Sequence, residues 1–341
     1  MTKARQLADL GNAYDDGALS NRNLIINGAM QVAQRGTSAT GIGAASGYFT
    51  CDRWGIGSTT SGRLTMTQDS DAPSGLGSSL KLDCTTADTS IGSTEKLTLR
   101  HLIEGQNLQQ FAKGTSDAKE FTVSFYVKGN ASATYTCELY DSANVRQISK
   151  TFSVTTAWTK VVLTYPSDTT GAFNNDNGTA LYLQIFLYAG SDFTSGTLNS
   201  TSWASDTKAN RVSSGGTSFF DSTSRTFQIT GVQLEVGDTA TPFEHRSFGD
   251  ELAKCQRYFE TRDFHQMVFA RGNTSGTGDV NTYLPFLVKK RAVPSVSQIS
   301  GDSNIVLVPL KLEGTRAVQT PGVAAGDVRT LNCLIHVDAE L

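Results

Sequence analysis

Charged residues are scarce in this sequence, and the scarcity narrows the class of protein. Asp, Glu, Lys and Arg make up 18% of the 341 residues, the net charge is −3, and no cluster of Lys and Arg occurs. A chain without a basic patch lacks the electrostatic signature of nucleic-acid binding. No apolar run approaches the roughly 20 residues of a membrane-spanning helix, and the first residues lack the apolar stretch of a signal peptide. We therefore expect neither nucleic-acid binding nor membrane insertion.

Closely spaced cysteines are missing as well. The five cysteines are far apart and odd in number, and no C-x-x-C pair exists. A disulfide framework or a zinc site would need paired cysteines. We therefore predict buried free thiols in a protein made in a reducing compartment. The five residues are Cys51, Cys84, Cys137, Cys255 and Cys333.

Recognisable catalytic motifs are also absent. The sequence has no GxSxG, HExxH or P-loop, and its four histidines stand alone. Hydrolysis of a glycosidic bond needs two carboxylates that flank the bond. Glu235 and Glu244 are candidates by count only, and we expect Glu235 to face solvent on its strand. The sequence therefore predicts a protein without catalytic activity.

One loop is rich in oxygen ligands. Asp168 and residues 174–177 (Asn-Asn-Asp-Asn) lie close together in the sequence. Such loops can bind Ca²⁺, but Asn and Asp also favour turns through local backbone hydrogen bonds. Because the spacing of a DxDxDG loop is absent, we predict no cofactor, with a structural calcium ion as the alternative.

Alternating apolar residues are abundant. They occupy one face of residues 121–127 and 135–139, and residues 181–188 are apolar on both faces, which predicts a central strand. The apolar run at residues 24–26 predicts another buried strand. Asn177-Gly178 is a typical hairpin turn.

About ten such strands fall between residues 23 and 237, without helices to cross between them. Strands of this kind pair mainly antiparallel and form two layers. We therefore predict an all-β fold. It is a jelly-roll-type β sandwich preceded by a short N-terminal helix and followed by a short helix and a smaller C-terminal β domain. Trp54 is expected in the core of the sandwich.

The stretch from Thr226 to Phe259 closes the sandwich. The apolar phase shifts by one residue at Gly231, which predicts a β-bulge. Ser247 followed by Asp250 is typical of a capping box, so a helix should begin here. Its apolar face would comprise Phe248, Leu252, Cys255 and Phe259.

These patterns predict three segments. Residues 1–22 comprise a helix with an apolar stripe and a linker, residues 23–246 the sandwich, and residues 247–341 the connecting helix and the small β domain. The N-terminal helix is too short to be stable alone. It either attaches the chain to a larger assembly or forms a bundle at a trimer axis, or it folds back onto the sandwich. The candidate assembly residues are Leu7, Leu10, Leu252 and Phe259.

Residues 190–224 form a long loop with little apolar periodicity, and compact domains rarely keep such loops without a function. A sugar site combines an exposed aromatic ring with amide and carboxylate partners. Trp203 with Asp206 and Asn210 is the candidate glycan site here. The alternative, in which Trp203 pins the loop to the sandwich, stays open.

Other aromatic residues offer alternative sites. Tyr126 and Tyr140 are expected on or beside outward strand faces. A site in the C-terminal unit would lie around Tyr283 or residues 271–280. The sequence does not choose between the two units.

Three segments carry a resemblance to a known family. They are NLIINGAMQVAQRG at residues 23–36, DRW at residues 52–54, and ITGVQLEVGDTATPFEHRSFGDELAKCQRYFE at residues 229–260. Together they resemble a family of bacteriophage virion proteins, common in phages of marine bacteria and described as tail-fibre or structural proteins. The similarity covers roughly residues 20–260.

The resemblance implies a virion component with a β sandwich like that of carbohydrate-binding modules. We expect a homotrimeric tail fibre or appendage that joins other virion tail proteins and adheres to host surface polysaccharide. It would be assembled in the host cytoplasm and reside in the virion tail. The alternatives are an architectural neck, nozzle or head-decoration protein, a stand-alone carbohydrate-binding module, and a depolymerase with acidic pairs between subunits.

Overall fold

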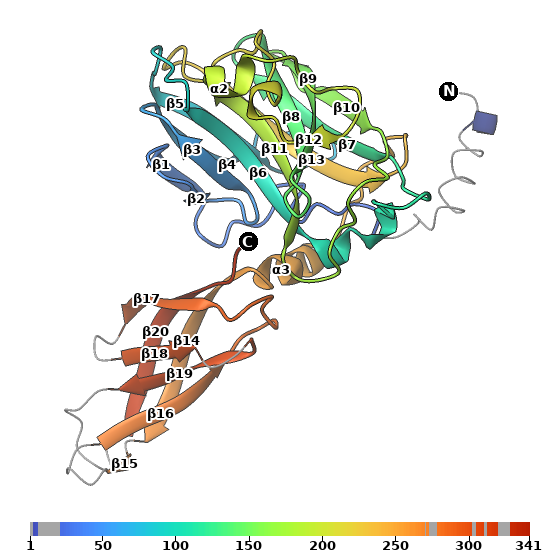
Figure 1. Ribbon diagram of the computed structural model, residues 1–341. Coiled ribbons are helices and arrows are strands. Elements are labelled where there is room, and N and C mark those ends of the chain that lie inside the picture. Colours follow the sequence, from blue (N-terminus) through green and yellow to red (C-terminus); the bar gives the residue numbers. More distant parts are fainter. Residues whose placement is uncertain are drawn as a thin grey trace. The chain divides into compact units, whose positions relative to one another are not determined.

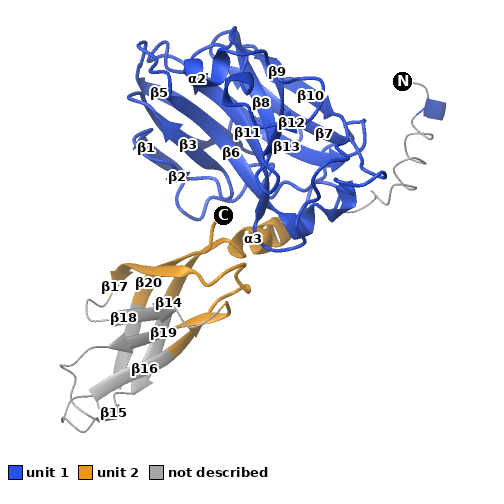
Figure 2. Cartoon of the chain, in the orientation of Figure 1, with its two compact units in different colours: residues 1–246 blue, residues 247–341 orange. Residues whose placement is uncertain are grey.

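The computed structural model describes residues 3–5, 21–269, 271–272, 278–301, 305–309, 312–319 and 328–341. The chain divides into two units, residues 1–246 and residues 247–341 (Figures 1 and 2). No helix in the described part combines the length and the apolar character that a membrane span requires.

Six strands form the first sheet of unit 1, in the order β1-β4-β5-β13-β7-β10, and every pair is antiparallel. Alternating residues turn an apolar face inward. In β7, for example, Phe121, Val123, Phe125 and Val127 are all fully buried. In order across the sheet the strands are β1 Ser38–Ile42, β4 Arg63–Asp69, β5 Ser79–Thr86, β13 Thr226–Val236, β7 Phe121–Gly129 and β10 Thr159–Tyr165.

Seven strands form the second sheet, in the order β12-β9-β8-β11-β6-β3-β2, again with antiparallel pairs only. The predicted central strand is β11, which lies between β8 and β6. Across this sheet the strands are β12 Ala204–Ser205, β9 Arg146–Val154, β8 Ala133–Asp141, β11 Thr179–Ala189, β6 Lys96–Glu104, β3 Gly55–Thr59 and β2 Gly47–Tyr48.

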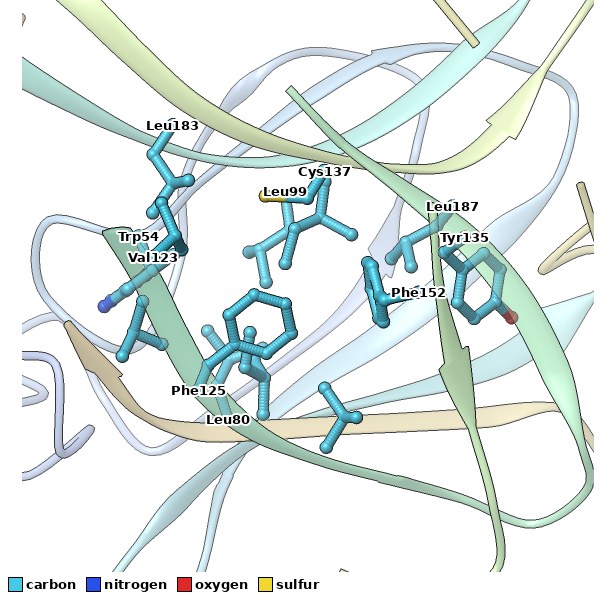
Figure 3. Packing of buried hydrophobic residues seen from close by; sticks show 14 of the residues in the cluster. Trp54, Leu80, Leu99, Val123, Phe125, Tyr135, Cys137, Phe152, Leu183 and Leu187 are labelled. Atoms are coloured by element: carbon cyan, nitrogen blue, oxygen red, sulfur yellow. The ribbon is translucent and has the colours of Figure 1, made fainter. Parts of the chain in front are cut away.

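Side chains from both sheets meet in one apolar layer (Figure 3). Leu80 and Phe125 come from the six-stranded sheet, and Leu99 and Cys137 from the seven-stranded sheet. Each fully buried Leu or Phe side chain contributes about 2 kcal/mol. Trp54 is buried in this layer, as predicted. The all-β, jelly-roll-type sandwich is confirmed, and all five cysteines are buried free thiols.

The predicted β-bulge is present in β13. Gly231 has φ +61°, and the pairing of β13 with β7 shifts between Thr230 and Gln233. Only glycine adopts this backbone region without strain. The shift lets Ile229 and Val232 both point inward, although they are three residues apart.

Two local predictions are wrong. Residues 24–26 form no strand, although Ile25 is buried, because this segment bonds to β13 only in places, such as Leu24 N to Leu234 O at 3.0 Å. Asn177-Gly178 is not a hairpin turn, since β10 and β11 belong to different sheets. The Oδ1 of Asp176 accepts from Gly178 N at 2.9 Å, so the dipeptide ends a loop that crosses between the sheets.

The chain enters and leaves unit 1 at one corner. Asn23 N donates to Glu244 Oε2 at 2.9 Å, and Asn23 Nδ2 donates to Val232 O at 3.1 Å. The guanidinium of Arg246 donates to Ile25 O at 3.0 Å and also to Asn23 O. Two of the segments that carry the family resemblance therefore contact each other here.

Short helices occur in the connections of unit 1. Two adjacent 3₁₀ turns follow β6, η1 Gly105–Asn107 and η2 Gln109–Phe111. The long loop contains α2 Ser191–Thr194 and η3 Lys208–Asn210.

Unit 2 begins with helix α3 (Phe248–Gln256), and the predicted cap at Ser247 is confirmed. The difference from a standard capping box is that the Asp250 carboxylate bonds the Ser247 hydroxyl. Ser247 Oγ accepts from Asp250 N at 3.2 Å. The Asp250 carboxylate accepts from Ser247 Oγ at 2.6 Å. Phe259 is buried but does not belong to the helix, because α3 ends at Gln256 and Phe259 opens β14.

The apolar helix face is only partly as predicted. Cys255 is buried, Leu252 is partly exposed, and Phe248 is 56% exposed.

The strands of unit 2 form a three-stranded sheet, β14-β20-β17, and a four-stranded sheet, β15-β16-β19-β18. In chain order they are β14 Phe259–Phe269, β15 Arg271–Gly272, β16 Gly278–Pro285, β17 Ser295–Gly301, β18 Ile305–Pro309, β19 Gly314–Gln319 and β20 Val328–Asp338.

The N-terminal prediction falls mostly outside the described residues. Residues 3–5 are helical and exposed. Leu7 and Leu10, the candidate assembly residues of this segment, lie outside the described ranges, as do residues 273–277 of the candidate loop in unit 2.

Candidate functional site

Trp203 is a core residue and not an exposed platform for a sugar ring. Its side chain is 6% exposed, and its ring centroid lies 5.5 Å from that of Phe121. The indole Nε1 donates to Pro166 O at 2.9 Å. The ring thus pins the long loop to the sandwich, which corrects the prediction that Trp203 stacks on glycan.

Asp206 and Asn210 do not gather around the Trp203 ring. Asp206 Oδ1 lies 3.9 Å from Arg211 Nε. The backbone of Asn210 holds the loop, since its carbonyl accepts from Asn199 N at 2.9 Å. The three predicted residues therefore do not form one site.

The oxygen-rich loop bonds a buried lysine ammonium, that of Lys113. Lys113 Nζ lies 2.6 Å from Asp141 Oδ2 and 3.1 Å from Asp168 Oδ2, and all three side chains are buried. Arg146 Nε donates to Asp168 Oδ2 at 2.7 Å. Although burial opposes the shift, the bonds from Arg146 and Lys113 lower the pKa of the Asp168 carboxyl. Among the described residues, no cluster of His, Cys, Asp or Glu could hold a metal ion.

Glu235 is buried, contrary to the expectation that it faces solvent. Its carboxylate accepts from Thr241 N at 2.9 Å, from Thr241 Oγ1 at 2.7 Å and from Gln233 Nε2 at 2.9 Å. Glu244 is engaged at the corner described above. The hydrogen bonds of both carboxylates therefore hold the segment that follows β13 in place.

The outer face of the seven-stranded sheet, the side that points away from the apolar layer, brings polar and aromatic residues together. In the strand register Tyr140 lies opposite Tyr182, and Glu138 lies opposite Gln184. The two tyrosine rings are partly exposed, with centroids 5.8 Å apart and planes tilted by 59°. Neither hydroxyl is hydrogen-bonded to another residue in the described ranges.

Arg211 of the long loop lies over the ring of Tyr140. Its guanidinium carbon is 4.6 Å from the centroid of the Tyr140 ring. Arg211 Nε and Nη2 each donate to Glu138 at 2.7 Å, which is a bidentate pair, and Gln184 Nε2 also donates to Glu138. Burial raises the pKa of the Glu138 carboxyl, and the bonds from Arg211 oppose this shift. The network holds the guanidinium at a fixed position beside the rings.

Further along β8 and β11 the outer face is covered by the long loop. Phe186 packs against Phe193 and Val212. Next to this cluster is a hollow of about 280 Å³, lined by apolar side chains and by several Ser and Thr residues. Its lining includes Thr136, Phe186, Tyr188, Ser191 and Thr217.

Sequence analysis suggested only Tyr140 from this site. Tyr182 and Gln184 look like ordinary members of an apolar strand, and Arg211 lies 71 positions from Tyr140 (211 − 140). Strand alternation could have placed Tyr182 outward, but not opposite Tyr140. Among the other candidates, Tyr126 is partly exposed on the six-stranded sheet, and Tyr283 of unit 2 is 51% exposed.

Chemically, the outer face offers what sugar rings require. Partly exposed aromatic rings can stack on the apolar C–H faces of a pyranose. Tyrosine hydroxyls and a fixed guanidinium can bond its hydroxyl edges.

No protein-family model and no curated protein matches the chain. Among solved structures, it is similar to the enzymatically active domain of tailspike protein 4 of bacteriophage CBA120, with 13% identity over 63% of this chain and 21% of that chain (TM-score 0.31). The chain thus spans about a fifth of the tailspike structure.

It is also similar to the carbohydrate-binding module CBM4, with 12% identity over 62% of this chain and 97% of that chain (TM-score 0.32). A third match is a family 11 carbohydrate-binding module of Clostridium thermocellum, with 11% identity over 55% of this chain and 91% of that chain (TM-score 0.29). These similarities are loose, and the sandwich fold rests on the strand pairing described above.

Proposed function

We propose that the protein binds glycan on the outer face of the seven-stranded sheet. The observation that carries this proposal is the pair of partly exposed tyrosines, Tyr140 and Tyr182, beside a guanidinium held in place by Glu138. An exposed aromatic pair has little structural reason to lie next to fixed polar groups. Together they suit a ring with one apolar face and a polar edge.

We further propose that the chain is a phage virion protein, a homotrimeric tail fibre or related appendage. It would adhere to host surface polysaccharide and join other virion tail proteins. Its place would be the virion tail, after assembly in the host cytoplasm. The support is the sequence resemblance across roughly residues 20–260. Closed cyclic symmetry is the usual arrangement of such assemblies.

The proposed role is adhesion without catalysis. Glu138 and Glu235 are buried and hydrogen-bonded within the protein, which agrees with a structural role for both carboxylates. Incubation with bacterial polysaccharides should therefore release no reducing ends. Their release would favour the depolymerase alternative.

The test of glycan binding is a microarray of bacterial capsular polysaccharides and lipopolysaccharide O-chains. The full chain should bind specific spots, and Tyr140→Ala/Tyr182→Ala should weaken that binding by about tenfold, as expected for losing two stacking rings. Tyr283→Ala is the matched control, since it removes an exposed tyrosine from unit 2.

Other outcomes would place the glycan site in unit 2 or argue against glycan binding. If Tyr283→Ala alone weakens binding, the site lies in unit 2. If the full chain binds no spot, the architectural alternative is favoured. Light scattering should give three times the chain mass, and a monomer would contradict the proposed trimer.

A further inference from the structure

Positive charge gathers on the outer face of the seven-stranded sheet. Lys96 and Arg100 alternate on β6 with inward-facing Leu97 and Leu99, so both point outward. Burial lowers the pKa of the Lys96 ammonium, and the nearby charges of Arg211 and Arg100 lower it further. Three cations are therefore close enough to repel one another.

The carboxylates nearby are engaged by other cations. Glu138 is bonded by Arg211 on two atoms. Asp192 Oδ2 lies 2.6 Å from Lys208 Nζ. Asp206 Oδ1 lies 3.9 Å from Arg211 Nε. Each faces the long loop rather than β6.

Arg100 and Lys96 are left without an acidic partner in the part of the chain that the structure describes. The Nε of Arg100 is also buried without a hydrogen-bond acceptor. The Lys96 ammonium lies 5.5 Å from the centroid of the Phe193 ring.

Two glycines of strand β3 lie next to Arg100 on the outer face. Gly55 lies directly opposite Arg100, and Gly57 is the next outward position of β3. A Cβ atom on Gly57 would lie 3.3 Å from Arg100 Nη1 and 2.5 Å from Thr98 Oγ1. The Arg100 guanidinium therefore lies against Gly57, where a side chain would displace it, and the Tyr48 ring lies over Gly55 beside it.

On the other side the backbone of Arg100 lies opposite Gln184 of β11, and Tyr182 is the next outward residue on that strand. A glycan chain that extends from Tyr182 across β6 would reach the guanidinium.

We propose that Arg100, supported by Lys96, binds the anionic group of an acidic glycan. This inference rests on the proposed glycan-binding function and adds the class of glycan. A guanidinium donates two parallel hydrogen bonds to a carboxylate or to a sulfate ester. Uronic acids and sulfated sugars share this chemistry.

The test compares matched polysaccharides that differ only in charge. The full chain is measured by biolayer interferometry on polygalacturonate and on its carboxyl-reduced form, and on dextran sulfate and on dextran. We expect at least one acidic polymer to bind about tenfold more tightly than its neutral counterpart. Which pair shows the difference separates a carboxylate from a sulfate.

Arg100→Gln should weaken binding of the acidic polymer about tenfold, in line with the loss of a charged hydrogen bond. Binding of the neutral polymer should not change. Lys160→Met is the control, because it removes one exposed positive charge from β10 in the other sheet. Lys96→Met changes only an outward side chain of β6 and should also weaken binding of the acidic polymer. It replaces Arg100→Gln in the test if that variant does not fold.

Two results would overturn the inference while leaving glycan binding intact. One is equal binding of acidic and neutral glycans, with Tyr140→Ala/Tyr182→Ala still weakening both. The other is an equal loss in Arg100→Gln and Lys160→Met, which would indicate attraction by net charge alone. Absence of binding to every polymer and every microarray spot would overturn the proposed function together with this inference.

Discussion

Replacing Lys113 by Met should strongly destabilise unit 1. The ammonium is fully buried and bonds to Asp141 at 2.6 Å, with Asp168 at 3.1 Å. It also donates to the carbonyls of Thr170 and Gly171 at 2.9 and 2.7 Å. Methionine fills a similar volume but leaves the two carboxylates buried without this cation.

The size of the effect follows from burial. Removing one partner of a buried ion pair costs about 4 kcal/mol, because the remaining charge stays desolvated. A domain of this size loses about 3 °C in melting temperature per kcal/mol. The expected drop for Lys113→Met is therefore roughly 12 °C.

The assay is urea and thermal unfolding of the full chain, followed by tryptophan fluorescence. All three tryptophans lie in residues 1–246, so the signal reports unit 1 alone. Lys81→Met is the matched control. Its ammonium lies 3.0 Å from Asp83 Oδ1, but about 30% of each side chain is exposed (29% and 31%), so the loss should stay below about 1 kcal/mol. Similar small losses for both variants would refute the reasoning.

Three further predictions concern other parts of unit 1. Asp168→Asn should destabilise at pH 7, and the difference from the unchanged protein should shrink as pH falls below the ordinary value of 3.8, because the lowered pKa of Asp168 stabilises only its ionised form. Thermal unfolding at several pH values checks this, and a pH-independent difference would contradict it. Gly231→Ala should cost about 2 kcal/mol in urea unfolding, since φ is +61° and a Cβ would lie 3.1 Å from the Tyr126 ring. Equal stability would show that the bulge tolerates a side chain. At pH 8 the native thiols should not react with Ellman's reagent, because burial raises the pKa of Cys51 and of Cys137 to about 12, and five should react after unfolding. Rapid reaction of the native protein would contradict this burial.

Features encoded within a few residues could be predicted from the sequence. Alternation defined the inward face of β7, a phase shift at Gly231 marked the bulge, and Ser247 marked the start of α3. Each depends on neighbours along the chain, so its physical cause is visible in a short window.

Features that depend on distant partners could not be predicted. Glu235 is buried because Thr241 returns to bond it, and Trp203 is buried because its indole bonds Pro166 and packs against Phe121. The tyrosine pair arises from the register between β8 and β11, which are separated by two other strands in the sequence. A shift of one residue would turn Tyr182 inward, and no local pattern fixes that register.

The corner at which the chain enters and leaves unit 1 has a mechanical consequence. Arg246 donates there to the carbonyls of Asn23 and Ile25, and these hydrogen bonds do not belong to either sheet. A pulling force applied between the two ends of the unit enters and exits at this one place. The load is therefore carried first by these few bonds and the strands beside them, before it reaches the pairing within either sheet.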